Sequence, residues 1–292
     1  MIPTDNLADV QFEAFDRLSR FINDTPDAIS AALVAELQGQ LHCTAKYAYT
    51  LLLAAAIGLD TNNNPLHRQI FHFVLEPALH QLNPKDYQRN SYYSSIKFEN
   101  TNYRQWQLRN LGYKPFEAFV CDDIAVNADG LQIPQIGFFI SPFHYPAVLQ
   151  DGRIWMTVTP NEVETMKEPV EKARGNVLTY GLGLGYYAYM VSNKNEVRSV
   201  TIVEKDRDII ELFAEKILPQ FPAKAKIKII NDDAFAHAAN HLANDDFDFV
   251  FTDLWHDVSD GLPLYLKMKE YEPSAPNTKF EYWIEKSIKC YL

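Results

Sequence analysis

The strongest constraint on the fold is an alternation of short apolar segments with longer amphipathic segments after residue 175. The apolar segments are five to seven residues long and rich in β-branched residues, as expected of buried β-strands. Strands joined by helices pair in parallel, because a parallel connection needs a long crossover. We therefore predict four parallel strands, at 176–180, 199–204, 226–230 and 247–253, with helices between them at 186–193, 206–218 and 234–243.

The first 112 residues have the spacing of helices instead. Apolar residues recur every three or four positions, for example at Phe12, Phe15 and Leu18. The segment 87–106 is aromatic and polar without a regular period, and we predict connecting structure there. A helical region therefore precedes the strands.

Two β-hairpins are predicted between the helical and the alternating parts. Strand-like segments at 116–126 and 131–140 flank a turn at Asn127–Gly130, and the segment 146–159 turns back at an Asp-Gly pair. A helix over 159–173 then leads into the first parallel strand. The predicted organisation is an N-terminal helical domain (1–112), a β-hairpin region (113–160) and an α/β domain (161–292).

Charge and composition exclude several classes of function. The net charge of -11 argues against a general nucleic-acid binder, since phosphate neutralisation needs clustered Lys and Arg. The three cysteines are far apart, and the histidine pairs His67/His72 and His237/His241 lack further ligands, so no metal site is predicted. The most apolar run, 47–59, is too short to span a bilayer, and the N-terminus lacks a secretory pattern. We expect a cytoplasmic protein with a small-molecule substrate and no membrane partner.

Three glycines alternate directly after the first parallel strand, at Gly181, Gly183 and Gly185. A turn from strand to helix needs backbone conformations that are open mainly to glycine. Without side chains, the main chain of such a turn also lies close to a ligand. A glycine turn alone is equally compatible with a purely structural role.

Acidic residues at the ends of the next three strands favour a ligand site. Glu204 ends the second strand, where its carboxylate can accept hydrogen bonds from both hydroxyls of a ribose. Asp233 follows the third strand and can receive an adenine amino group, with the Ala234 backbone beside the ring edge. Asp253 ends the fourth strand. Because the carboxyl ends of parallel strands share one edge of the sheet, these residues are expected to lie together.

This pattern resembles the class I S-adenosylmethionine-dependent methyltransferases and their close relatives, the spermidine synthases, over about residues 145–260. The resemblance implies a Rossmann-like sheet and S-adenosyl-L-methionine as cofactor. It implies that the glycine turn holds the methionine part, that Glu204 holds the ribose and that Asp233 holds the adenine. Tyr186, just past the glycines, is a candidate to contact the methionine group, and packing explains it as well. Asp253 would face the sulfonium. An NAD site is disfavoured, because a dinucleotide fingerprint needs glycine where Tyr186 stands.

The spermidine synthases differ from this chain in the residues that bind the polyamine. On the resemblance, those enzymes carry a Gln on the strand where this chain has Trp155, and a Tyr-His pair in the helix that reads 161-NEVETM-166 here. They also carry two aspartates spaced DxxD, whereas Asp253 and Asp257 stand one residue further apart. We therefore predict a methyltransferase acting on a small-molecule or other non-nucleic-acid acceptor. The alternatives are a spermidine-synthase-like aminopropyltransferase and a non-catalytic S-adenosylmethionine-binding interaction protein.

The loop after the fourth strand supplies the candidate catalytic residues. An amine or hydroxyl acceptor must lose a proton, and Asp253, His256 and Asp257 are placed to take it. Glu162 and Glu164 are candidates to meet the ammonium of the cofactor, although a solvated helix face explains them equally well.

Too few residues follow Asp253 for the three further strands of a complete methyltransferase sheet, so a shortened sheet is predicted. The last segments, 261–273 and 279–292, are predicted to be mainly helical. The substrate side of the site must then come from residues 1–160 or from the second subunit of a homodimer.

Overall fold

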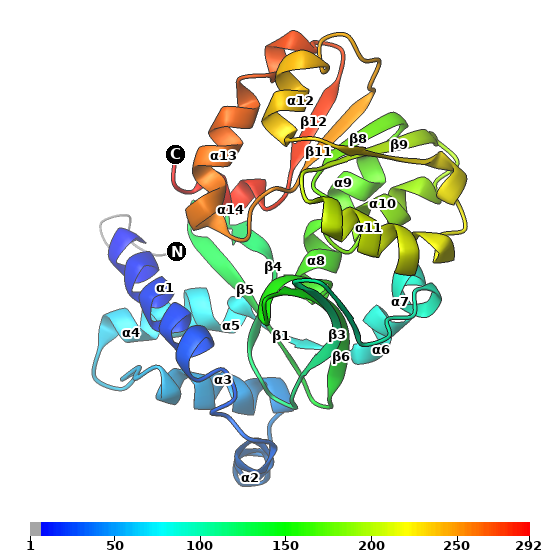
Figure 1. Ribbon diagram of the computed structural model, residues 1–292. Coiled ribbons are helices and arrows are strands. Elements are labelled where there is room, and N and C mark those ends of the chain that lie inside the picture. Colours follow the sequence, from blue (N-terminus) through cyan, green and yellow to red (C-terminus); the bar gives the residue numbers. More distant parts are fainter. Residues whose placement is uncertain (1–6) are drawn as a thin grey trace. The chain divides into compact units, whose positions relative to one another are not determined.

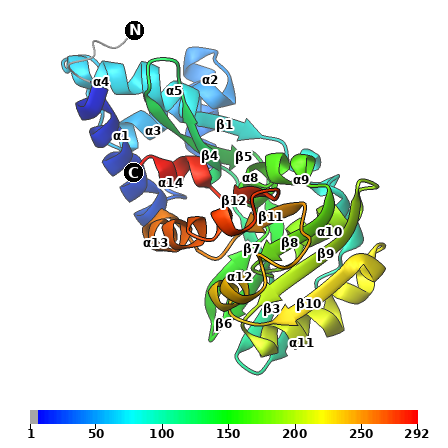
Figure 2. The same ribbon diagram turned by 90° about the horizontal axis from the view of Figure 1, so that it is seen from above.

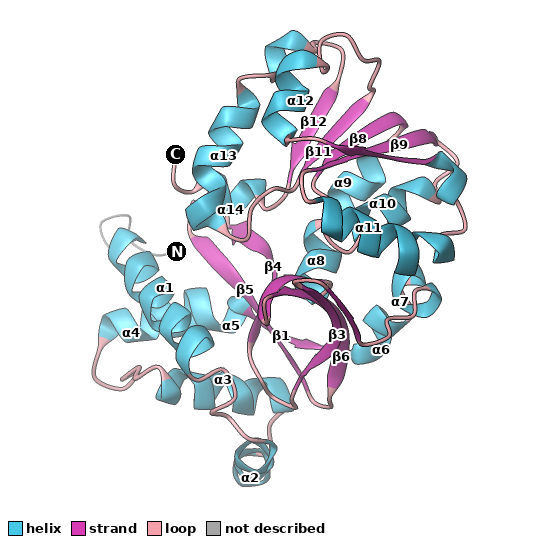
Figure 3. Cartoon of the chain, in the orientation of Figure 1, coloured by secondary structure: helices cyan, strands magenta, loops and turns pink. Residues whose placement is uncertain are grey.

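The computed structural model describes residues 7–292 and divides into two compact units. The first contains Met1–Asp86, in its described part, together with Gly112–His144, and the second contains Tyr87–Leu111 with Tyr145–Leu292. Helices dominate the first unit, whereas strands and helices alternate along most of the second (Figure 3). The two predicted hairpins both form, but they fall into different units, so these units do not follow the boundaries drawn from the sequence at 112 and 160.

Helices and one small sheet build the first unit. Its helices are α1 (Leu7–Asp24), α2 (Ala31–Leu41), α3 (Ala45–Ala56), α4 (Pro65–Gln69), the π-helical η2 (Ile70–Leu75) and α5 (Glu76–Ala78). The sheet has the order β1-β5-β4, in which β1 (Leu79–Leu82) pairs in parallel with β5 (Gln132–Phe139) and β4 (Phe119–Val126) pairs antiparallel to β5. The short helix α6 (Pro84–Gln88) follows β1.

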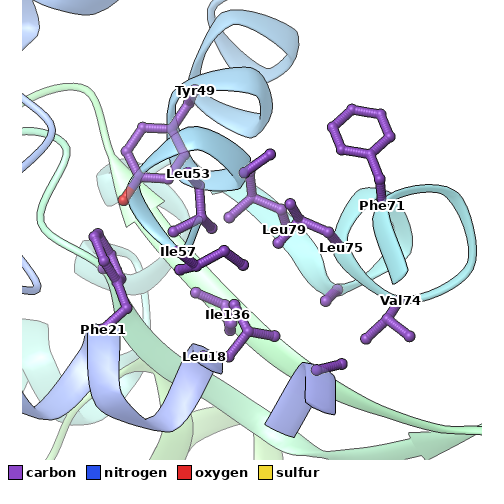
Figure 4. Close-up of a cluster of buried hydrophobic side chains, with 14 of the residues drawn as sticks. Leu18, Phe21, Tyr49, Leu53, Ile57, Phe71, Val74, Leu75, Leu79 and Ile136 are labelled. Carbon is purple, nitrogen blue, oxygen red and sulfur yellow. The ribbon is translucent and has the colours of Figure 1, made fainter. Parts of the chain in front are cut away.

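The core of this unit lies between the helices and the sheet (Figure 4). Leu18 and Phe21 of α1, Leu53 of α3 and Ile136 of β5 are buried in one cluster. Phe12, by contrast, is 78% exposed, because the buried stripe of α1 passes through Val10, Ala14 and Leu18 instead.

The segment predicted as connecting structure forms helix α7 (Ser91–Ser95) and strands β2 (Thr101–Tyr103) and β3 (Trp106–Tyr113). The prediction of connecting structure is wrong here, because a helix and strands form in this segment. The two strands join the second hairpin, β6 (Phe143–Gln150) and β7 (Arg153–Thr157), in a four-stranded sheet of order β2-β3-β6-β7.

A five-stranded sheet, all of whose strands are parallel, organises the rest of the second unit. Its order is β10-β9-β8-β11-β12, formed by β8 (Gly175–Tyr180), β9 (Val197–Glu204), β10 (Ile227–Asn231), β11 (Phe249–Thr252) and β12 (Lys279–Tyr282). The predicted α/β fold class, with a Rossmann-like sheet shortened at its C-terminal end, is confirmed. The helical prediction for 279–292 is corrected, since a fifth strand, β12, precedes the last helix.

Helices cover both faces of this sheet (Figures 1 and 2). Right-handed crossovers place α10 (Tyr186–Ser192) and α11 (Arg207–Lys216) on one face, with α12 (Ala234–Asn240) and α13 (Val258–Lys269) on the other. The predicted helix over 159–173 is two helices, α8 (Pro160–Thr165) and α9 (Lys167–Lys172). The remaining elements are η3 (Leu218–Gln220), η4 (Lys224–Lys226), η5 (Glu272–Ser274) and α14 (Glu285–Lys289).

The strand order reverses between β8 and β11, because the chain runs from β8 outward to β10 and returns to the other side of β8. Ligands of open α/β sheets bind at such a reversal, beyond the carboxyl ends of the strands. Across residues 7–292, no helix combines the length and apolar character needed to cross a membrane.

Candidate active site

The glycine turn lies at the reversal of strand order and is closely packed. Gly181, Gly183 and Gly185 all have positive φ angles, of 99°, 50° and 73°. A Cβ atom on Gly181 would lie 2.0 Å from the carbonyl oxygen of Asp253, at the end of the neighbouring strand. Gly181 therefore allows the turn to contact the end of β11, which no other residue type would permit without a shift of the backbone.

The other two glycines face different neighbours. A Cβ on Gly183 would meet the sulfur of Met156 in β7, and Gly183 lines the same cavity as Gly181. A Cβ on Gly185 would lie 2.4 Å from the ring of Phe213 in α11. Gly185 is not among the residues that line the cavity, because it packs at the start of α10 against α11. Its place in the predicted cofactor site is corrected to helix packing.

Glu204 ends β9 with its side chain at the glycine turn. The carboxylate accepts hydrogen bonds from the backbone N–H of Leu182 (3.3 Å) and from that of Asp206 (2.8 Å). Burial raises the pKa of Glu204, and these backbone hydrogen bonds offset only part of the increase. The end of β9 and the glycine turn after β8 are thus connected by a hydrogen bond in the wall of the cavity.

The third strand end supplies a helix cap. Asp233 precedes α12, and its Oδ1 accepts hydrogen bonds from the backbone N–H groups of Phe235 (2.9 Å) and Ala236 (3.0 Å). Both Asp233 and Ala234 line the cavity.

Two carboxylates from different elements line the cavity near one another. Asp253 follows β11, and its backbone N–H donates to the carbonyl of Tyr180 in β8 (2.9 Å). Glu162 lies in the first turn of α8, with only 8% of the residue exposed, and its Oε2 has no hydrogen-bond partner. Burial raises the pKa of Glu162, and the nearby Asp253 raises it further; burial also raises the pKa of Asp253, to about 7. A cation bound between these groups would oppose the increase and lower the pKa of both carboxyls.

Of the three residues predicted in the loop after β11, Asp253 and His256 line the cavity and Asp257 does not. His256 lines the cavity, and its Nδ1 lies 2.9 Å from Oδ2 of Asp260. Asp257 instead caps α13, since its Oδ1 accepts hydrogen bonds from the backbone N–H and the hydroxyl of Ser259. Asp257 does not line the cavity, so its predicted catalytic position is corrected to that of an N-cap residue.

Asp260 was missed by the sequence analysis. It occupies the third helical position after the Asp257 cap and accepts hydrogen bonds from the backbone N–H groups of His256 and Asp257. The spacing of an N-cap residue and an acid three positions later is the signature of a capping box, and this signal was present in the sequence.

Tyr186 also lies outside this cavity. Its hydroxyl accepts a hydrogen bond from the side-chain amide of Asn90 (2.9 Å), and its ring packs edge-on against Tyr92 of α7. Tyr186 lines a different cavity, together with Asn90 and Lys167. The reason is its position on α10, which contacts α7. Glu164 likewise faces away from the candidate site and pairs with Lys167.

The candidate site as a whole is a cavity of about 520 Å³ within the second unit. Its outer walls are mostly apolar and include Trp155 of β7 and Leu264 of α13. Lys205 is the one Lys or Arg among the described residues that line it. It collects eight of the candidate residues named from the sequence: Glu162, Gly181, Gly183, Glu204, Asp233, Ala234, Asp253 and His256.

No group of three or more His, Cys, Asp or Glu residues within the described range 7–292 is arranged to hold a metal ion.

Comparison with known proteins gives one family match. Residues 164–269 match the model of the spermine/spermidine synthase domain. This segment runs from the end of α8 to the end of α13 and contains the glycine turn, Glu204, Asp233 and Asp253. No curated protein matches the chain.

Among solved structures, a spermidine synthase from Thermotoga maritima aligns at 18% identity and a TM-score of 0.34, over 47% of this chain and 49% of that chain. A spermidine synthase in complex with the transition state analogue AdoDATO aligns at 18% identity and a TM-score of 0.33, over 47% of this chain and 48% of that chain. The alignment spans about half the length of each of these proteins.

The family match corrects the functional prediction. The segment that carries the site matches a spermine/spermidine synthase domain, so the prediction of a methyltransferase is wrong and the aminopropyltransferase alternative is favoured. The predicted resemblance to spermidine synthases is confirmed for residues 164–269. The α/β segment 164–269 is therefore similar to the spermine/spermidine synthase domain.

Proposed function

We propose that this protein is an aminopropyltransferase that moves a 3-aminopropyl group from decarboxylated S-adenosylmethionine to an amine. The observation that carries the proposal is the pair of carboxylates that line the cavity, Glu162 and Asp253, of which Glu162 has a buried oxygen without a partner. The match of residues 164–269 to the spermine/spermidine synthase domain supports it.

The charge of this pair separates the two donors that a spermidine-synthase-like fold would bind. Decarboxylated S-adenosylmethionine ends in an ammonium group, whereas S-adenosylmethionine carries a carboxylate beside its ammonium. A buried carboxylate is stabilised by a cation and destabilised by a further anion. Glu162 and Asp253 therefore favour the decarboxylated donor.

Other residues of the cavity are proposed to hold the adenosine part of the donor. Glu204 lies at the glycine turn and is proposed to accept hydrogen bonds from the ribose hydroxyls. Asp233 and Ala234 are proposed to meet the adenine edge. Gly181 and Gly183, which line the same cavity, are proposed to lie beside the sulfonium chain.

The reaction is an in-line displacement in which positioning supplies most of the rate enhancement. The lone pair of the acceptor nitrogen forms a C–N bond to the propyl carbon next to sulfur. The C–S bond breaks at the same time, and its electron pair leaves with sulfur, which becomes the neutral thioether of methylthioadenosine. The nitrogen loses one proton, so the step needs a neutral amine and no redox partner.

Incubation of the full chain with decarboxylated S-adenosylmethionine and a panel of diamines and monoamines tests the proposal. Mass spectrometry should detect methylthioadenosine and an amine heavier by one aminopropyl group, in equal amounts. Calorimetry should show at least about tenfold tighter binding of the decarboxylated donor than of S-adenosylmethionine, equivalent to ~1.4 kcal/mol.

Two matched variants test whether the preference for the decarboxylated donor depends on the carboxylates of Glu162 and Asp253. Glu162→Gln should remove the preference for the decarboxylated donor, because its unpartnered carboxylate becomes neutral. Glu164→Gln, two residues along and paired with Lys167, should keep the preference. Equal binding of both donors by the unmodified protein would contradict the proposal, and binding without product would favour the non-catalytic alternative.

A further inference from the structure

His256 and Asp260 form a hydrogen-bonded pair on the wall of the cavity, and the pair is distinct from the carboxylates of Glu162 and Asp253. The imidazole Nδ1 lies 2.9 Å from Oδ2 of Asp260. Both residues line the cavity, and 47% of the His256 side chain is exposed. The ring is therefore accessible to a bound molecule and is held at one nitrogen.

The hydrogen bonds around Asp260 determine which nitrogen of the ring carries the proton. Asp260 also accepts hydrogen bonds from the backbone N–H of His256 (3.0 and 3.2 Å) and from that of Asp257 (3.1 Å). Burial raises the pKa of Asp260, but the hydrogen bonds from the His256 ring and the two backbone N–H groups outweigh it, so the pKa is lowered overall. An ionised carboxylate can only accept, so Nδ1 must donate and Nε2 of the neutral ring is left as a proton acceptor.

A second contact restrains the plane of the ring. Trp155 of β7 packs edge-on against His256, with ring centroids 4.6 Å apart at 85°. Trp155 is itself packed against Trp106 of β3, at 5.8 Å and 80°. The imidazole is thus fixed by a carboxylate from α13 and an indole from the β6–β7 hairpin. Such double restraint is typical of a group that must keep one orientation for proton transfer.

We propose that His256 Nε2 removes the proton from the acceptor amine, and that Asp260 is a positioning residue that holds the ring in the required tautomer. The inference rests on the proposed aminopropyl transfer. The proton that the acceptor nitrogen loses moves to Nε2 and gives an imidazolium, whose positive charge Asp260 stabilises. The nitrogen lone pair forms the C–N bond, and sulfur leaves with the electrons of the C–S bond. The imidazolium then releases the proton to solvent.

The tautomer can be measured without any assay of activity. In the full-length protein labelled with ¹⁵N-histidine, the His256 ring should show a protonated Nδ1 and an unprotonated Nε2, with His256→Gln used to assign the signal. Asp260→Asn should shift the ring toward the opposite tautomer, because the asparagine amide can donate to Nδ1. The same tautomer ratio in both proteins would overturn the role of Asp260, whether or not the protein transfers aminopropyl groups.

Kinetics with two acceptors test the role of His256. With a strongly basic amine, which is protonated at neutral pH, kcat should fall about 100-fold in His256→Gln and about 10- to 100-fold in Asp260→Asn. KM for the donor should remain within about threefold, since neither residue belongs to the proposed donor contacts. With a weakly basic fluorinated amine, which is already neutral, both defects should shrink to within about fivefold.

Two further variants separate this proposal from its rivals. Asp257→Asn removes one charge from the same loop but keeps a good N-cap, and it should leave kcat unchanged. Asp253→Asn should raise the KM for the donor equally with both acceptors, as expected of a residue that holds the donor. If the Asp253→Asn defect depended on acceptor basicity and the His256→Gln defect did not, Asp253 would be the proton acceptor and the proposal would be overturned. A wild-type protein that forms no product refutes the aminopropyl transfer, and the tautomer measurement still decides the role of Asp260.

Discussion

The carboxylate of Glu204 accepts a hydrogen bond from the backbone N–H of Leu182, over 3.3 Å, and so connects the end of β9 to the glycine turn that follows β8. This contact brings the acid at the end of β9 to the glycine turn after the neighbouring strand β8, in the cavity that Asp253 and Glu162 also line. The predictions below follow from the contacts around it.

Glu204→Gln should weaken binding of decarboxylated S-adenosylmethionine by about tenfold or more, since a hydrogen bond to a charged acceptor contributes ~1.5–3 kcal/mol. Isothermal titration calorimetry measures the change. Glu215→Gln, which alters an exposed carboxylate paired with Lys216 on α11, serves as control and should bind as the wild type does. Unchanged affinity in Glu204→Gln would exclude Glu204 as a ligand contact.

Gly181→Ala should destabilise the fold by more than about 2 kcal/mol, because a positive φ and a clash with the Asp253 carbonyl act together. Gly152→Ala provides the matched control. Gly152 also has a positive φ, of 81°, but a Cβ there meets nothing within 4 Å, so the loss should be only ~1 kcal/mol. Urea denaturation of both variants measures the difference, and equal losses would show that the contact with Asp253 is unimportant.

The contribution of Glu162 and Asp253 to the free energy of unfolding should fall as the pH rises from about 4 to 7. Burial raises the pKa of Asp253 to about 7 and that of Glu162 well above its ordinary value, whereas both carboxyls ionise near pH 4 in the unfolded chain. Over this range the folded protein holds protons that the unfolded chain has released, so deprotonation favours unfolding.

Glu162→Gln should weaken this dependence, because the amide neither titrates nor repels Asp253. At pH 8 the variant should gain at least ~1 kcal/mol over the wild type, and the gain should disappear toward pH 5. Denaturation curves at a series of pH values provide the measurement. Parallel stability profiles of the two proteins would show that the pair is not strained by its charges.

Tyr186→Phe should leave the affinity for the decarboxylated donor unchanged and lower the free energy of unfolding by ~1 kcal/mol. Its hydroxyl bonds to Asn90 in another cavity, so the variant loses one hydrogen bond and no ligand contact. Calorimetry and urea denaturation test the two halves of the prediction separately. A loss of donor affinity would show that Tyr186 contacts the donor.

The sequence pattern predicted the part of the site that depends on strand ends. Glu204 and Asp253 could be placed together because parallel strands present their carboxyl ends at one edge, whatever the rest of the chain does. The direction in which the residues at the start of helix α10 point was harder to predict. Gly185 and Tyr186 continue the same motif, but the first turn of α10 points them at α11 and α7 instead of the cavity.

Long-range contacts account for most of what the sequence did not predict. The segment 87–111 belongs to the second unit through contacts such as those of Tyr92 with the Leu184 carbonyl and of Tyr103 with Glu211, and no local period announces them. The burial of Glu162 likewise depends on the packing of α8, since a Glu in the first turn of a helix usually faces water.

The reversal of strand order between β8 and β11 divides the site into two halves, whose residues follow different strands. Gly181, Glu204 and Asp233 follow the strands on one side of the seam, whereas Asp253, His256 and Asp260 follow the strand on the other. On the proposed function, adenosine recognition and acceptor chemistry are thus encoded in separate stretches of chain. Substitutions in the loop between β11 and α13 are then expected to change which amine is used without altering the residues proposed to hold the nucleoside.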